Sequence, residues 1–581
     1  MNFELKGFSK QIFLSRHAAH ENEPWEDACK RVAWHIVDAE PGNVRQQYFT
    51  EFYSALVENR FMPGGRIWYG SGKAKGQLLN CFVIPTEDSR EGWGQTMYDS
   101  IVISGTGGGV GLNCSPIRPR NSPIRGTGGT ATGSVSLMEM IDAAGNVIKA
   151  GGGRRTALML CLNISHPDII EFLDKKLDLK QLNNANISVV FDKDPEIFFD
   201  LVKKGLDFPL VFKEKQIGII PAAKLWDIII KNALAGGEPG ILNSYLANRL
   251  SNIYYHEELT STNPCGEIWM SPYDCCCLGH LVLPRFVNTQ DKTVNWDLLR
   301  STIRTGVRFL DDVLTVNNYP LPIVQRTTAG LRRIGLGVTG LHHMLIMLGY
   351  KYSSVEGLEF ADKLANFIKN ESYEMSIDLA KEKGSFPEFK AAEFLKSAFV
   401  KKLKPTIREK IKLYGIRNCA LNTIAPTGTI SIVCDVSSSI EPIFAMAYER
   451  RYRKNDELKM EIVSDPLFSH YVKNGLNTEC FENAYDISIR DHFEMQRVWQ
   501  NHIDNAVSKT INLPPGTSAE ELSNMYMEFL PELKGVTVYP VGSRENQPLT
   551  PLSREVAEQV VFDAQVEVMS QDSCKSGACD V

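Results

Sequence analysis

The chain has 581 residues, of which 43% are hydrophobic and 23% are charged, and its formal net charge is −6. This composition predicts a globular protein with a large core, and the slight negative charge gives no basic footprint for binding nucleic acid. No run of about 18 apolar residues is present and the N-terminus is too polar for a secretion signal, so we predict neither a membrane span nor export.

Residues 1–70 are predicted to be mainly helical and polar-faced, with their end at residues 62–65 (MPGG). Glycines are dense at 104–133 and again at 151–155, which predicts loops whose backbone approaches a ligand closely or takes positive φ. Between these loops, residues 136–149 have the pattern of an amphipathic helix.

Short β-branched segments at 187–191, 428–433 and 536–539 are predicted to be strands, and residues 358–383 carry apolar residues at the spacing of one helical face. Short strands alternating with long helices predict an α/β fold with parallel strands. Residues 569–581 are polar and rich in small side chains, so we expect a mobile tail.

The segment Asn263-Pro264-Cys265-Gly266-Glu267 combines an amide, a thiol and a carboxylate. Pro264 favours an extended conformation for the residue before it, and alternate residues of an extended segment point to the same side. Asn263, Cys265 and Glu267 are therefore expected to project into one pocket, where Glu267 could act as a general base. The alternative is a surface turn with incidental polar residues, because a five-residue pattern is short.

Further cysteines suggest a dithiol that is oxidised in the reaction and must then be reduced again. Cys81 and Cys276 could pair across the fold, and in a strand Cys276 would face away from Cys275 and Cys277. The chain lacks the C-x2-C pairs of most zinc sites, so a structural metal is the disfavoured alternative. We interpret the following as buried small hydrophobes: Cys29, Cys114, Cys161, Cys419, Cys434 and Cys480.

Cys574 and Cys579 lie on the polar tail, where two thiols can exchange with other disulfides. Accidental terminal cysteines are the alternative. The total of thirteen cysteines is odd, which argues against a fully paired secreted framework. We therefore predict a cytoplasmic location, where disulfides are usually catalytic.

Two further groups of residues suit phosphate. Residues 425–431 (APTGTIS) gather hydroxyls and a glycine beside a predicted strand, which by itself is a weak signal. Charged residues flank the glycine-rich loops, namely Asp88, Arg118, Arg120, Arg125, Arg154 and Arg155. Clustered arginines suit polyphosphate or carboxylate, although half of these could be solvated surface charges.

Over essentially its whole length the chain resembles the catalytic subunit of the ribonucleotide reductases. The matching stretches, in chain order, are MPGGRI, LLNCFVIP, GTGGGVGLNCSPIRP, GGGRRTALM, HPDIIEF, NPCGEI, GLRRIGLGVTGL, APTGTISIV, SSSIEPIFA and CKSGAC. The resemblance implies a ten-stranded α/β barrel, made of two antiparallel halves of five parallel strands, with the radical cysteine on an internal loop. It also implies a short helical region without an ATP-cone at 1–70, the barrel with effector loops at 71–566, and a redox-active tail at 567–581.

The resemblance assigns roles to the reactive residues. Cys265 would be the thiyl-radical site that abstracts the 3′-hydrogen of a ribonucleotide, Glu267 would take the 3′-hydroxyl proton, and Asn263 would hydrogen-bond the ribose hydroxyls. Cys81 and Cys276 would supply the electrons that expel the 2′-hydroxyl as water, ending as a disulfide.

Binding residues and partners follow from the same resemblance. Cys574 and Cys579 would pass electrons from thioredoxin or glutaredoxin to the dithiol. The residues implied in substrate binding are Asn80, Ala425, Pro426, Thr427, Gly428 and Thr429. The residues implied in binding a dNTP or ATP effector are Asp88, Arg118, Arg125 and Arg155. Monomeric members of the family carry a long insertion that this chain lacks, which implies a homodimer. The resemblance to dimeric members favours diphosphate substrates.

The radical source is predicted to be adenosylcobalamin. Tyr526 and Tyr539 are well separated, whereas oxygen-dependent members carry adjacent tyrosines near the C-terminus. Residues 535–549 are similar to the TVYRDGSR segment of adenosylcobalamin-dependent members, although Pro540 and Val541 replace the Arg-Asp pair. No RVCGY-like motif of the glycyl-radical class is present.

Two alternatives remain open. The first is an oxygen-dependent large subunit that needs a separate radical-generating subunit. The second is a non-catalytic nucleotide-binding regulator, which would be expected to lose Cys265 or Glu267, and both are present.

Overall fold

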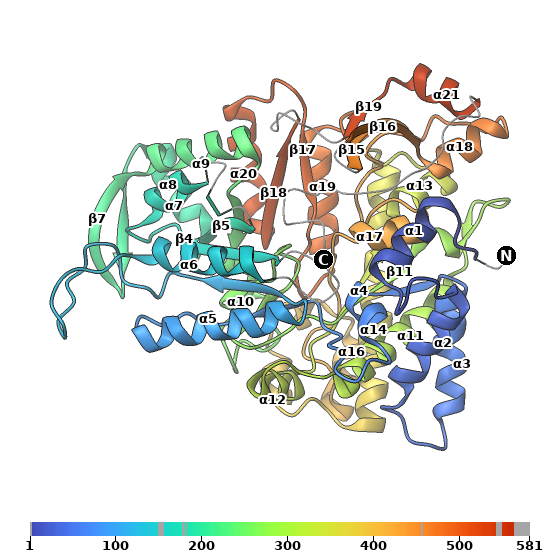
Figure 1. Ribbon diagram of the computed structural model, residues 1–581, viewed down its shortest axis with the longest axis horizontal. Helices are drawn as coiled ribbons and strands as arrows, with labels where there is room; N and C mark the ends of the chain where they lie inside the picture. Colours follow the sequence, from blue (N-terminus) through green and yellow to red (C-terminus); the bar gives the residue numbers. More distant parts are fainter. Residues whose placement is uncertain are drawn as a thin grey trace.

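The N-terminal region is mainly helical, as predicted. The computed structural model describes residues 3–148, 156–176, 181–182, 184–454, 457–541 and 549–562. The first elements are α1 (Gly7–Arg16), α2 (Trp25–Val37), α3 (Arg45–Val57), β1 (Phe61–Pro63) and α4 (Gly65–Gly70). On α2, buried Ala28, Val32 and Ile36 recur every four residues, which gives one apolar face. Helices α2 and α3 pack against α11 (Trp296–Val316), as Figure 1 shows.

Within the described residues, the largest sheet has seven strands in the order β17-β18-β8-β5-β4-β3-β2. Their bounds are β2 (Cys81–Val83), β3 (Gly109–Asn113), β4 (Leu158–Asn163), β5 (Ala185–Phe191), β8 (Gly240–Asn243), β17 (Thr510–Leu513) and β18 (Gly535–Pro540). Strands β2, β3, β4, β5 and β8 are parallel to one another. Strand β18 pairs antiparallel with β8 and parallel with β17.

A smaller sheet has the order β1-β11-β14, in which β11 (Leu278–Val282) and β14 (Gly335–Thr339) are parallel. Isolated bridges connect the two sheets. Phe82 bridges Cys275 in an antiparallel sense, while Leu336 bridges Asn422 and Ile424 bridges Val507 in a parallel sense. The fold is therefore a mixed α/β structure in which both sheets meet around the segments 274–282 and 422–424.

Helices surround these sheets, and several begin at a capping side chain. Ser354 accepts a hydrogen bond from the backbone of Gly357 at the start of α14, and Asn295 does the same for Leu298 on α11. Further helices are α5 (Arg90–Gly105), α6 (Ser134–Val147), α7 (Ile169–Lys175), α8 (Pro195–Lys204), α9 (Ala222–Gly236), α10 (Ser244–Arg249), α12 (Pro322–Leu331), α13 (Leu341–Leu348), α14 (Val355–Lys383), α15 (Ala391–Phe394), α16 (Pro405–Tyr414), α17 (Gly428–Cys434), α18 (Pro466–Lys473), α19 (Ile489–Gln500), α20 (Ala519–Phe529) and α21 (Arg554–Phe562). In the part of the chain that is described, no helix has the length and apolar character needed to cross a membrane.

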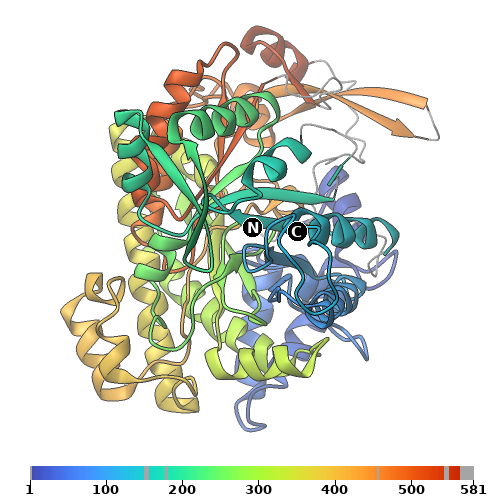
Figure 2. The same cartoon turned by 90° about the vertical axis from the view of Figure 1, so that its left-hand side faces the viewer.

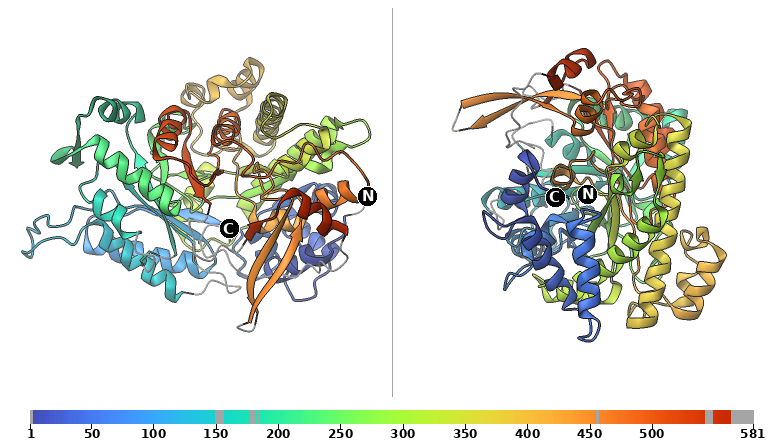
Figure 3. Two further views of the ribbon diagram at one scale, coloured as in Figure 1. Left: turned by 90° about the horizontal axis from the view of Figure 1, so that it is seen from above. Right: turned by 90° about the vertical axis from the view of Figure 1, so that its right-hand side faces the viewer.

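Two hairpins extend outward from the sheets. Strands β6 (Asp207–Phe212) and β7 (Lys215–Pro221) form one of them, at the end of the molecule opposite the N-terminal helices (Figure 1). Strands β15 (Ala447–Lys454) and β16 (Glu457–Ser464) form the other, which projects from the body in Figures 2 and 3 and pairs with β19 (Leu549–Pro551).

Most helix and strand predictions are confirmed, but the strand predicted at 428–433 is wrong. Strands β5 and β18 contain the predicted segments 187–191 and 536–539, α14 contains 358–383, and α6 corresponds to the helix expected at 136–149. Residues 428–433, however, belong to helix α17. Ile430, Val433 and Cys434 are buried at helical spacing, and α17 packs against α1, so tertiary contacts override the β-branched pattern.

Candidate active site

The segment 263–267 is a hairpin turn and not an extended strand. It joins the short antiparallel strands β9 (Ser261–Thr262) and β10 (Trp269–Met270). The backbone N–H of Asn263 donates to the Ile268 carbonyl (3.2 Å), and the Ile268 N–H donates to the Asn263 side-chain oxygen (3.1 Å). Gly266 has φ 82°, which closes the turn. The predicted extended conformation is therefore wrong.

The turn nevertheless buries its functional side chains. Asn263 and Glu267 are fully buried and Cys265 is half-buried, so the alternative of a surface turn is also wrong. Among the described residues, neither Glu267 oxygen nor Asn263 Nδ2 has a hydrogen bond of good geometry. Burial raises the pKa of Glu267 to about 7, although the nearby Asn263 amide opposes this shift. A buried carboxyl with a pKa near neutrality suits a general acid or base.

Two glycines of β3 make room for this turn. A Cβ atom on Gly111 would lie 1.8 Å from the Thr262 carbonyl oxygen. A Cβ atom on Gly109 would lie 2.9 Å from Pro264 Cγ and 3.1 Å from Cys81 Sγ. The loop predicted for this part of the glycine-rich segment is wrong, because Gly109 and Gly111 belong to strand β3. Their missing side chains let β3 lie close to the turn at 263–267, not to a ligand. This close approach brings Cys81 beside Pro264.

Cys81 and Cys276 lie next to each other on antiparallel segments. The Cys276 N–H donates to the Cys81 carbonyl (2.9 Å), and the Cys81 N–H donates to Cys276 Sγ (3.1 Å). Both side chains are fully buried. Burial raises the pKa of Cys276 well above its ordinary value, and the neighbouring Cys81 and Glu267 add to the rise. The two thiols and the carboxyl of the turn therefore share one buried site.

The neighbours of Cys276 point elsewhere, as predicted. Cys275 Sγ lies 3.0 Å from Thr328 Oγ1, and Cys277 Sγ donates to the Leu310 carbonyl (3.5 Å). Of the cysteines interpreted as packing residues, Cys29, Cys114, Cys161, Cys419 and Cys434 are buried, and Cys480 is only half-buried. Within the described ranges, no group of three or more His, Cys, Asp or Glu side chains is arranged to hold a metal ion.

The residues expected to bind substrate lie at the same site. Ala425 packs in one apolar cluster with Cys81, Cys276 and Ile268. Asn80 is buried, and its side-chain oxygen has no hydrogen-bond partner in the described part of the chain. The segment 425–429 leads into the start of α17, where Pro426, Gly428 and Thr429 are half-buried.

Thr427 has an internal role at the start of α17. It is buried with φ 56°, and its hydroxyl accepts from the Ser439 N–H (2.7 Å) and lies 3.0 Å from Thr339 Oγ1. Ser439 Oγ itself is buried without a partner in the region described, as is Thr262 Oγ1 beside the turn. Sequence reasoning missed both hydroxyls, and the serine run at 437–439 was the available signal for Ser439.

The residues expected to bind an effector form a separate group. Asp88 accepts from the Arg118 guanidinium (2.9 Å) and lies 3.5 Å from Lys213 Nζ. Arg125 is exposed on a loop in which Pro123 bridges Thr130. Arg120 donates instead to Glu171 (2.6 Å), and Arg154, Arg155, Cys574 and Cys579 lie outside the described residues. The structure thus brings Asp88 and Arg118 together, just before the start of α5.

Two family models and several known proteins are similar to this chain, and their names all point to one enzyme family. The family model "Ribonucleotide reductase, barrel domain" matches residues 79–539, and "Ribonucleotide reductase, all-alpha domain" matches residues 3–76. The chain is 36% identical over 580 residues to the vitamin B12-dependent ribonucleoside-diphosphate reductase of Thermoplasma acidophilum, covering 93% of this chain and 72% of that protein. The similarly named protein of Mycobacterium tuberculosis (strain H37Rv) is 34% identical over 591 residues, with 97% and 80% covered. The ribonucleoside-diphosphate reductase large chain of Encephalitozoon cuniculi is 26% identical, with 78% and 63% covered.

Proposed function

The chain belongs to the ribonucleotide reductase family, and from this premise we propose that it is an adenosylcobalamin-dependent reductase of ribonucleoside diphosphates. It forms the 2′-deoxyribonucleotides needed for DNA synthesis. The Thermoplasma and Mycobacterium relatives, at 36% and 34% identity, are named as vitamin B12-dependent, whereas the large chain at 26% is not. This difference favours the adenosylcobalamin type over the oxygen-dependent alternative.

One observation carries the proposal: a single buried turn holds Cys265 between Asn263 and Glu267, beside the Cys81–Cys276 pair. In this proposal Cys265 takes the 3′-hydrogen, Glu267 accepts the 3′-hydroxyl proton, and Asn263 holds the ribose hydroxyls. The unpaired polar atoms of Asn263 and Glu267 support such a ligand, because buried polar groups otherwise find partners.

The overall change balances in atoms and electrons. Cys81 and Cys276 each give up a hydrogen and together lose two electrons, forming one S–S bond. The C2′–O bond of the substrate breaks, the hydroxyl leaves as water, and a hydrogen takes its place at C2′. The adjacency of the two buried sulfurs supports this role for the pair.

The residues at the turn fit a radical source that is bound against the site. Cys265 is half-buried, whereas Cys81 and Cys276 are fully buried, so Cys265 offers the accessible thiol of the three. When bound, adenosylcobalamin supplies a carbon-centred radical that can take a hydrogen from a thiol. The protein's part is to hold Cys265 on a fixed turn, keep Glu267 buried and exclude water.

We propose the ten-stranded barrel for this chain on the basis of its pairings. Strands β2, β3, β4, β5 and β8 would form one parallel half. Strands β11, β14, β17 and β18 together with the segment 422–424 would form the other. The antiparallel pairings of β8 with β18 and of Phe82 with Cys275 support two seams between the halves.

Substrate and effector sites follow as further proposals. Asn80 and the segment 425–429 would hold the substrate, and Asp88, Arg118, Arg125 and Arg155 would bind a dNTP or ATP effector. The domain limits 1–70, 71–566 and 567–581, the electron donors thioredoxin or glutaredoxin, and the cytoplasmic location stay predictions.

A homodimer would bury an exposed apolar surface. Helices α5 and α6 pack against each other and expose Tyr98 (58%), Ile101, Met140 and Val147 (81%). Exposed large apolar side chains on neighbouring helices suit a symmetric contact with a second copy.

The proposal is tested with the purified chain, a ribonucleoside diphosphate and a small dithiol, under anaerobic conditions, with and without adenosylcobalamin. We expect deoxynucleotide only when adenosylcobalamin is present, and no need for a second subunit. Product that forms only after a dimetal radical-generating protein is added would instead support the oxygen-dependent alternative.

A pH dependence is expected from Glu267. As a general base it must be deprotonated, and burial raises its pKa to about 7. Turnover should therefore fall as the pH drops below about 7, and Glu267→Gln should slow it roughly 10²–10⁴-fold and remove that acidic limb. Rates measured between pH 5.5 and 9 check this, with exposed Glu409 replaced by Gln as the control. An unchanged acidic limb in Glu267→Gln would contradict the assignment.

A further inference from the structure

Glu267 is held in place through its backbone. Its carbonyl oxygen accepts a hydrogen bond from the Ala506 N–H (2.8 Å) and one from Thr423 Oγ1 (2.7 Å). All three residues are buried. The position of the Glu267 carboxyl therefore depends on where the segment around residue 506 lies.

The Cys276 segment is held from another side. Asp274 is fully buried, and its carboxylate accepts from the Cys275 N–H (2.8 Å), one residue before Cys276. Its carbonyl accepts from the Val83 N–H (3.2 Å), two residues after Cys81. The position of the Cys81–Cys276 pair therefore depends on Asp274.

One side chain connects these two supports. Arg333, which is 4% exposed, donates from Nε to Asp274 Oδ2 (2.6 Å) and from Nη1 to Asn505 Oδ1 (3.1 Å). Asn505 directly precedes Ala506, and its amide donates to the carbonyls of Asn422 (2.9 Å) and Ile334 (3.2 Å). We infer that Arg333 is a positioning residue, which fixes Glu267 relative to the dithiol.

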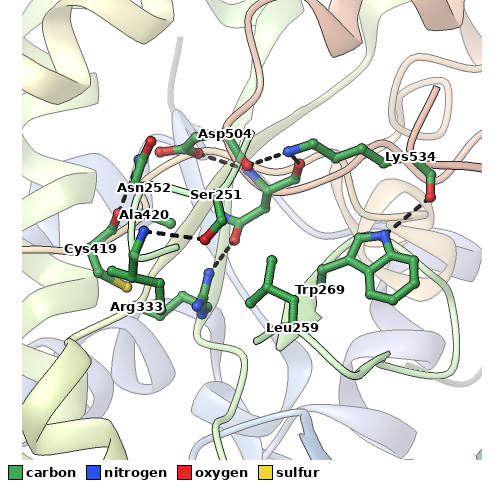
Figure 4. A pocket seen from close by; sticks show the side chains of 11 residues that line it. Ser251, Asn252, Leu259, Trp269, Arg333, Cys419, Ala420, Asp504 and Lys534 are labelled. Carbon is green, nitrogen blue, oxygen red and sulfur yellow. Dashed lines mark hydrogen bonds between the residues drawn. The ribbon is translucent and has the colours of Figure 1, made fainter. Parts of the chain in front are cut away.

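The surroundings of Arg333 leave no space for a ligand larger than about one water, although its Nη2 has no hydrogen-bond partner among the described residues. Figure 4 shows Arg333 and Lys534 reaching the wall of a cavity from opposite sides, with Trp269 and Asp504 beside them. Lys534 Nζ donates to the carbonyls of Asp504 and Asn505 (2.6 Å each), and its own carbonyl accepts from Trp269 Nε1 (3.1 Å). Only about 10 Å³ of this cavity is open to the centre of a water molecule, which is roughly the space for one water.

The guanidinium shape is essential to this role. A guanidinium presents a planar fork that can bond two separate acceptors at once, and a lysine ammonium is a single point charge on a flexible stem. Arg333→Lys keeps the charge that balances Asp274 but cannot reproduce the fork. We therefore expect it to loosen the link to Asn505 without leaving an uncompensated buried carboxylate.

Arg308 offers a matched control. It is 3% exposed, against 4% for Arg333, and it also bridges two partners, here the carboxylates of Glu40 (2.9 Å) and Glu382 (2.6 Å), but it lies on α11 among the N-terminal helices and α14. Arg308→Lys removes the same fork from a comparably buried site, whose hydrogen bonds among the described residues go to neither the turn nor the dithiol. A purely structural effect of losing a buried fork should appear equally in both variants.

The inference rests on the proposed function, so the experiment includes the wild-type chain with adenosylcobalamin. We expect Arg333→Lys to lower kcat about 10- to 100-fold while KM stays within about threefold, because the reacting groups are displaced and substrate binding is not. Arg308→Lys should lower the thermal unfolding midpoint and leave kcat unchanged. If Arg333→Lys does not fold, Asn505→Ser replaces it as the test variant, because it keeps the Arg333–Asp274 pair. We expect Asn505→Ser to lower kcat as well, by a smaller factor.

The other outcomes overturn the inference in different ways. A folded Arg333→Lys with wild-type kcat, or an equal loss of kcat in Arg308→Lys, would make Arg333 a structural residue only. If Asn505→Ser is used in place of Arg333→Lys, a wild-type kcat in that variant would likewise make Arg333 a structural residue only. A wild-type chain that forms no deoxynucleotide with adenosylcobalamin would remove the proposed function, and this inference with it.

Discussion

Cys265→Ser is expected to abolish deoxynucleotide formation while nucleotide binding stays nearly unchanged. The substitution exchanges one atom, sulfur for oxygen, in a half-buried side chain on a turn whose shape is fixed by Gly266 and the Asn263–Ile268 hydrogen bonds. Its structural effect should therefore be small. A hydroxyl does not readily become a hydrogen-abstracting radical, so the chemical step has no substitute.

The measurement pairs an activity assay with a binding assay. Product is quantified with adenosylcobalamin and a dithiol, and nucleotide binding is followed by calorimetry on the same sample. Cys480→Ser is a suitable control, because Cys480 is also half-buried but packs at the edge of the cluster around Phe468, away from the turn. Turnover by Cys265→Ser above background would remove Cys265 from its assigned role.

The sequence predicts which residues gather at the site more reliably than it predicts the conformation of the segment that carries them. Asn263, Cys265 and Glu267 were expected to share a pocket because alternate residues of a strand point to one side. Asn263 and Glu267 are indeed buried near each other, but on a hairpin turn closed by Gly266. The turn depends on pairing between β9 and β10 and on the space left by Gly109 and Gly111, and neither follows from local pattern.

Helix α17 shows the same limit. Its β-branched residues at 429, 430, 432 and 433 favour a strand, yet Ile430 and Val433 are buried at helical spacing, α17 packs against α1, and the helix begins after the left-handed Thr427. The support of the site was beyond sequence reasoning altogether. Arg333 reaches Asp274 across 59 residues and Asn505 across 172, so the link exists only once the segments have been brought together.

Replacing Cys574 and Cys579 together by serine is expected to allow a single turnover but to block continued turnover with thioredoxin. Cys81 and Cys276 are fully buried, so a disulfide between them would be out of reach of a bulky protein reductant. A carrier that can approach both is needed, and two thiols at the end of the chain can serve by thiol–disulfide exchange. Cys574 and Cys579 lie outside the described residues.

Two controls test whether the terminal thiols act as the electron carrier. A small dithiol that enters the site directly should restore continued turnover in the double variant, because it does not need the carrier. Ser576→Ala, which changes the tail between the two cysteines but keeps both thiols, should cycle normally with thioredoxin. Product is counted per chain, first without an external reductant and then with each reductant in turn. Normal cycling of the double variant with thioredoxin would show that the internal disulfide is reached by another route and that the terminal thiols are dispensable.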